Sequence, residues 1–150
     1  MKYYTFDICS FDYDDEEGEN RFFNAQEAVQ NEYSKIKKCF PKEFDELYQK
    51  NYFHDYIIES LDLVKKIDKT GFDLVLILSH QDESWKISYC NVKEYKINLT
   101  MKDDYCEFGD YLYGEILKKS KHTFTHEFYF YNFNNIIYVE FEKMIICKII

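Results

Sequence analysis

The chain has 150 residues, of which 46% are hydrophobic and 31% are charged, and its formal net charge is −9. This length fits one domain, residues 1–150, with a proper core, and this composition is typical of folded rather than disordered proteins. The negative charge disfavours binding to nucleic acid, which needs clustered Lys and Arg, and it also disfavours an anionic membrane surface.

The opening residues, MKYYTFDICSF, lack the basic and apolar regions of a signal peptide, and no apolar run reaches the roughly 18 residues of a membrane span. The cysteines are scattered, odd in number and without a Cys-x-x-Cys pair, which indicates reduced thiols rather than a disulfide framework. They are Cys9, Cys39, Cys90, Cys106 and Cys147. We therefore expect a cytoplasmic protein.

The first elements differ sharply in composition. Tyr4, Phe6 and Ile8 alternate with more polar neighbours, which predicts a first strand within residues 1–11. The next segment, DYDDEEGEN, holds six acids and no base. It is expected to be a solvated loop with Gly18 at its turn.

Two helices are predicted next. Asn24 followed by Glu27 fits a capped helix start, and apolar residues at 3–4 spacing from Ala25 to Phe40 predict one buried stripe. Pro41 ends this helix and is well placed to begin a second one within residues 41–52.

Alternating strands are predicted after His54. Residues 56–67, 72–80 and 84–101 show strand patterns, with a bulge or bend near Asn91, and residues 122–131 and 136–150 suggest a closing hairpin. Residues 111–119 fit either a strand or a helix turn. The predicted fold class is α+β, with N-terminal helices packed on a mainly antiparallel β-sheet.

The pair His54-Asp55 suggests a general base oriented by a carboxylate. Adjacent strand residues point to opposite faces, however, so Asp55 should not easily orient its neighbour, and no nucleophile motif accompanies the pair. We favour a structural role, in which Asp55 caps a turn and His54 bonds the backbone where a strand begins. We therefore expect that the chain is not an enzyme. A small hydrolase that uses His54 is the alternative.

Metal and nucleotide sites are not predicted. His122 and His126 lie in a strand pattern, about 13 Å apart, which is too far for one ion. The acidic segment has its glycine at the wrong position for a calcium loop and Phe23 where the bidentate Glu belongs. The few glycines form no phosphate-binding motif. We therefore expect no cofactor.

Two acidic groups are candidate sites for a basic protein partner. The first would speed association with a cationic protein, and it comprises Asp12, Asp14, Asp15, Glu16, Glu17 and Glu19. The second mixes acids with aromatic residues, as interfaces do, and it comprises Asp103, Asp104, Tyr105, Glu107, Phe108, Asp110 and Tyr111. A simple solubility loop would also produce the first group, and a strand with one exposed and one buried face would also produce the second.

Several short stretches carry a family resemblance: MKYYT, YFHDYIIESLDL, FDLVLIL, GDYLYGEI and the final IIYVEFEKMIICKI. They resemble small bacterial proteins that begin Met-Lys-Tyr-Phe-Thr, carry a Leu/Phe-His-Asp motif before a β meander and finish on a similar hairpin. The general pattern is also similar to immunity proteins of polymorphic-toxin and contact-dependent inhibition systems. That resemblance implies binding to a toxin domain, often a basic nuclease, and blocking of its active site.

The expected function is therefore that of an immunity or inhibitor protein with a protein partner and with no nucleic acid or membrane partner. An inhibitor of a nucleic-acid enzyme, carried by a phage or mobile element, would use the same acidic surface against a different target. The hydrolase that uses His54 is the third hypothesis.

Overall fold

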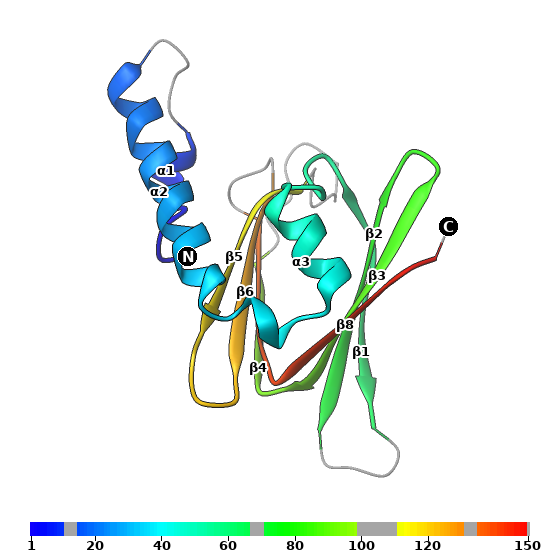
Figure 1. The fold of residues 1–150 in the computed structure, drawn as a ribbon. Helices are drawn as coiled ribbons and strands as arrows, with labels where there is room; N and C mark the ends of the chain where they lie inside the picture. The colour runs from blue at the N-terminus through cyan, green and yellow to red at the C-terminus, as the bar shows by residue number, and fades with distance from the viewer. Residues whose placement is uncertain (11–14, 67–70, 99–110, 131–134, 150) are drawn as a thin grey trace.

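The computed structural model describes residues 1–10, 15–66, 71–98, 111–130 and 135–149, and its fold is α+β, as the sequence predicts (Figure 1). The N-terminal third holds the helices α1 (Phe6–Cys9), α2 (Glu16–Ser34) and α3 (Lys42–Gln49), with a 3-10 helix, η1 (Lys37–Cys39), between the last two. The strands are β1 (Ile57–Lys65), β2 (Phe72–His80), β3 (Glu83–Val92), β4 (Glu94–Asn98), β5 (Tyr111–Lys118), β6 (Phe124–Phe130), β7 (Ile136–Phe141) and β8 (Lys143–Lys148).

The strands form two antiparallel sheets rather than one. The first sheet has the order β1-β2-β3-β8 and the second has the order β4-β7-β6-β5. The ambiguous segment at residues 111–119 is strand β5, and β6 and β7 pair as the predicted hairpin. The chain passes from one sheet to the other twice, between β3 and β4 and between β7 and β8.

The two passages lie beside each other and are held by polar contacts. The predicted bend near Asn91 is confirmed, since this residue has a φ of 56° at the end of β3. The amide of Asn91 donates to Glu142 over 2.8 Å, and the Lys93 ammonium lies 2.7 Å from the same carboxylate. The two passages are also joined by backbone hydrogen bonds. The Lys93 N–H donates to the Glu140 carbonyl, and the Glu142 N–H donates to the Cys90 carbonyl.

A second junction joins the far edges of the sheets. The Asp55 N–H donates to the Tyr111 carbonyl over 2.9 Å, and the Tyr111 N–H donates to the Tyr56 carbonyl over 2.7 Å. These bonds connect the segment before β1 to the start of β5. The two sheets therefore enclose one core, which α3 covers from between them (Figure 1).

The main core takes apolar side chains from both sheets and from α3. Its fully buried members include Phe44, Leu74, Leu76, Leu78, Ile87, Tyr89, Ile116, Phe128, Phe130, Ile137, Val139 and Phe141. A second cluster lies on the opposite face of β6, where Tyr4, Phe22, Ala25 and Val29 pack around Tyr129. Helix α2 thus covers the outer face of the second sheet, and β6 is buried on both sides.

The predicted first strand is wrong, because residues 1–10 hold only the short helix α1. The carboxylate of Glu115, 1% exposed on β5, accepts the N–H groups of Lys2 at 2.8 Å and Tyr3 at 2.7 Å, and it also accepts the N–H of Tyr4. These donors, which a strand would have paired with a neighbouring backbone, are instead satisfied by one side chain.

The start of the first long helix was also predicted wrongly. Helix α2 begins at Glu16 rather than near Asn24, and Gly18 lies buried inside it rather than at a turn. Asp15 is the N-cap, and its carboxylate accepts the Glu17 N–H over 3.2 Å. Acids in the first turn complement the helix dipole, so the acidic segment starts the helix that it was expected to precede.

The second predicted helix is confirmed. Pro41 occupies the N-cap position of α3, which runs from Lys42 to Gln49. The preceding helix ends at Ser34 rather than Phe40, and the short helix η1 lies between α2 and α3.

Replacing Glu115 with Ala is expected to lower the free energy of unfolding by about 3 kcal/mol, because three donors lose a charged acceptor at a buried site. Urea unfolding measures this loss, and amide hydrogen exchange at Lys2, Tyr3 and Tyr4 should accelerate. Glu59→Ala, at an exposed position on β1, is the matched control. Equal stabilities of the two variants would contradict the role given to Glu115.

Candidate functional site

The first acidic group lies partly on an exposed helix end. Asp12 and Asp14 fall outside the described residues, whereas Asp15, Glu16, Glu17 and Glu19 are exposed at the start of α2. This end of the helix projects beyond the strands (Figure 1). Arg21 is the single base between residues 15 and 34, and it lies 3.8 Å from Asp15. The carboxylates are therefore presented to solvent with little compensation.

The exposed side of α2 carries a pattern that the sequence reasoning missed. Glu16, Glu19, Phe23 and Glu27 follow one another at helical spacing, and all four are exposed. We call these four residues the acidic stripe. The Phe23 side chain is 54% exposed, while its neighbour Phe22 packs into the second cluster. A helix start placed at residue 16 would have revealed this stripe from spacing alone.

The second acidic group cannot be assembled from the described residues. Asp103, Asp104, Tyr105, Glu107, Phe108 and Asp110 lie outside them. Tyr111 begins β5 and is 3% exposed, with its ring inside the main core. Tyr111 pairs with Phe130 of β6, and both rings are buried. The Tyr111 ring is therefore not available as the partner anchor that the sequence suggested.

His54 and Asp55 do contact each other. The Nδ1 atom of His54 lies 2.8 Å from a carboxylate oxygen of Asp55. The expectation that these adjacent residues point apart was wrong, since β1 begins only at Ile57 and Asp55 has a φ of 70°. Among the described residues no hydroxyl or thiol is hydrogen-bonded to His54. The backbone of Asp55 meanwhile serves the junction with Tyr111.

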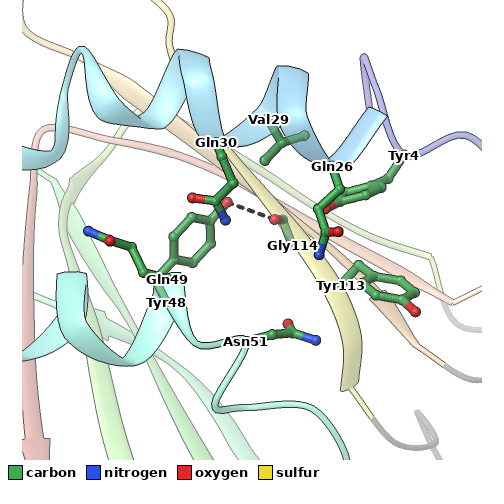
Figure 2. Close-up of a pocket in the computed structure, with 9 residues that line it drawn as sticks. All are labelled: Tyr4, Gln26, Val29, Gln30, Tyr48, Gln49, Asn51, Tyr113 and Gly114. Carbon is green, nitrogen blue, oxygen red and sulfur yellow. Dashed lines mark hydrogen bonds between the residues drawn. The ribbon is translucent and has the colours of Figure 1, made fainter. Parts of the chain in front are cut away.

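A small polar cavity lies where α2, the end of α3 and β5 meet (Figure 2). Its volume is about 30 Å³, which fits one water molecule or the tip of one side chain rather than a metabolite. We call it the amide notch, because carboxamides surround it: Gln26, Gln30, Gln49 and Asn51. Sequence reasoning could not find it, since its residues come from separate elements.

The hydrogen bonds around the amide notch leave three carboxamides without a partner in the described parts of the chain. Tyr48 at the bottom donates its hydroxyl to the Gly114 carbonyl over 2.8 Å and accepts the Ile116 N–H over 3.3 Å. Gln49 donates to Asp45 over 2.6 Å. The unpartnered carboxamides belong to Gln26, Gln30 and Asn51, so they are available to a ligand.

The described residues offer little for metal or disulfide chemistry. Within these ranges no group of three or more His, Cys, Asp or Glu could hold a metal ion, and the cysteines described, Cys9, Cys39, Cys90 and Cys147, are free thiols. None of the helices described is long and apolar enough to cross a membrane.

Comparisons of this chain with protein-family models, with curated proteins and with solved structures gave no match in any of the three.

His126 is the most unusual histidine of the fold. It lies on β6 inside the core, 2% exposed, while His122 is exposed in the preceding turn. Its Nδ1 lies 3.0 Å from the Tyr89 hydroxyl, and its Nε2 has no partner among the described residues. Burial disfavours the charged ring and lowers the pKa of His126 from 6.5 to about 3.

This shift has a defined consequence for stability. Between about pH 6.5 and pH 3, His126 binds a proton in the unfolded chain but not in the folded chain. The free energy of unfolding therefore falls as the pH drops through this range. Each pH unit in it costs about 1.4 kcal/mol.

Between about pH 7 and pH 5 the wild-type protein is expected to lose about 2 kcal/mol through His126, and His126→Met should remove that part of the pH dependence. Urea unfolding at both pH values measures the change within each variant, which is independent of their absolute stabilities. His122→Met should keep the wild-type slope. An unchanged slope in His126→Met would show that this ring does not titrate as described.

Proposed function

We propose that this protein is an immunity or inhibitor protein that binds a toxin domain with a basic surface, such as a nuclease, and neutralises it by occluding the active site. The observation that carries the proposal is the acidic stripe, which combines three exposed carboxylates with one exposed aromatic ring on a single helix.

The charges of this surface suit a cationic partner. Asp15 and Glu17 flank the acidic stripe, and Arg21 is the single base between residues 15 and 34. Clustered charge of one sign raises the rate at which oppositely charged proteins meet. A nuclease holds its polyanionic substrate with Lys and Arg, so carboxylates presented on a rigid helix compete for the same groups.

Phe23 gives the surface an apolar anchor. Large aromatic residues contribute most of the binding energy in many interfaces, surrounded by polar residues that contribute less. With 54% of its surface exposed, the Phe23 ring adds little to the core and can be buried by a partner. It takes the anchoring role that Tyr111, inside the core, does not offer.

Neutralising Glu16, Glu17 and Glu19 together to Gln should slow association with the partner toxin by about tenfold at low salt, with a smaller effect on dissociation. Stopped-flow or surface binding kinetics measure both rates, with the protein that co-purifies with this chain from its native cell as the partner. The matched control neutralises three exposed acids elsewhere, Glu59→Gln, Asp62→Asn and Asp82→Asn. Equal association rates for the two triple variants would remove α2 from the interface.

Phe23→Ala serves as the complementary variant in the same experiment. It should raise the dissociation rate while leaving association nearly unchanged, because an anchor acts after the encounter. Ile145→Ala, which removes an apolar side chain of similar exposure (47%) from β8, is its control.

Two other functions remain as candidates. An inhibitor of a nucleic-acid enzyme, encoded by a phage or mobile element, would use the same acidic stripe, and a phage cassette rather than a toxin gene beside it would favour that function. The contact of 2.8 Å between His54 and Asp55 favours a small hydrolase. A hydrolase screen in which His54→Ala abolishes a measured activity would establish that third candidate.

A further inference from the structure

The amide notch continues the acidic stripe along α2. Gln26 follows Phe23 by three residues, and Gln30 follows Gln26 by four, so these carboxamides lie on the flank of the helix that also carries Glu19. A partner that covers the acidic stripe would therefore reach the amide notch without crossing another element.

The chemistry of the amide notch limits what it can hold. The free carboxamides of Gln26, Gln30 and Asn51 offer oxygen acceptors and N–H donors. The Tyr48 hydroxyl already bonds two backbone groups, so it shapes the cavity rather than binding a ligand. None of the residues that line the cavity is charged.

Charge and the bordering aromatic rings favour an arginine side chain. Amides accept from cations and donate to anions equally well, so the surroundings decide. The exposed carboxylates that the same helix carries, Glu19 and Glu27, favour a cation. The rings of Tyr4 and Tyr113 border the cavity, as Figure 2 shows. A guanidinium is planar, weakly hydrated and able to stack on aromatic rings, whereas a lysine ammonium is compact and strongly hydrated.

We infer that the amide notch is the binding site for an arginine side chain of the basic partner, with Gln26, Gln30 and Asn51 as its acceptors. This inference rests on the proposed function, because it places one specific contact within the surface that the acidic stripe defines. The acidic stripe would bring any cationic protein close, and the amide notch would select a partner with an arginine at the matching position.

The test uses hexa-arginine and hexa-lysine as probes of the ¹⁵N-labelled protein at low salt. Both peptides should shift the backbone signals of Glu16, Glu17 and Glu19. Only hexa-arginine should shift the side-chain NH₂ signals of Gln26, Gln30 and Asn51, and it should bind about tenfold more tightly, as expected for charge-assisted hydrogen bonds.

The double variant Gln26→Met and Gln30→Met keeps side-chain length while removing both carboxamides. It should abolish the preference for hexa-arginine and leave the affinity for hexa-lysine unchanged. Asn31→Met, at an exposed position on the other flank of α2, should keep the preference and serves as the control.

The outcomes separate this inference from the proposed function. If both peptides shift the start of α2 but bind equally well, or if the preference survives the double variant, the amide notch does not bind arginine while the acidic surface stands. If neither peptide shifts the start of α2, the acidic surface fails and the inference fails with it.

Discussion

The placement of α2 depends on one buried carboxylate. Glu115 projects from β5 away from the main core and gathers the backbone N–H groups of Lys2, Tyr3 and Tyr4. That contact holds the Tyr4 ring 5.9 Å from Phe22 of α2 and against Tyr129 in the second cluster. These contacts place α2 on the second sheet. The same helix carries the acidic stripe and one wall of the amide notch.

Helix α2 has a buried side and an exposed side. Phe22, Ala25 and Val29 are buried against the second sheet, and the acidic stripe faces solvent. Substitutions on the exposed side are therefore expected to have little effect on folding, since exposed positions contribute little to stability, and this side is the one to which we assign partner binding.

Local patterns in the sequence were enough to predict α3, the bend at Asn91 and most strands, because period and turn chemistry are local properties. The division into two sheets was not predictable, since residues 136–150 read as a single strand of a hairpin, whereas the chain changes sheet at Glu142, between β7 and β8. The early start of α2 was missed because an acidic run looks like a solvated loop unless its first residue is recognised as a cap.

The candidate site was likewise only partly predictable from local sequence patterns. The exposed acids of α2 were found from composition, whereas Phe23 needed the correct helix start and the amide notch needed the meeting of α2, α3 and β5. The role of Glu115 was equally hidden, because its partners lie more than 110 residues away in the chain.

That long separation also governs the order of events during synthesis. Helix α2 leaves the ribosome well before β5 and β6, the strands that bury Phe22 and Val29. At about 5–20 residues per second, the helix waits for several seconds with its apolar side uncovered. Helix α2 is therefore made early but is among the last elements to dock, and in that interval it is exposed to chaperones and proteases.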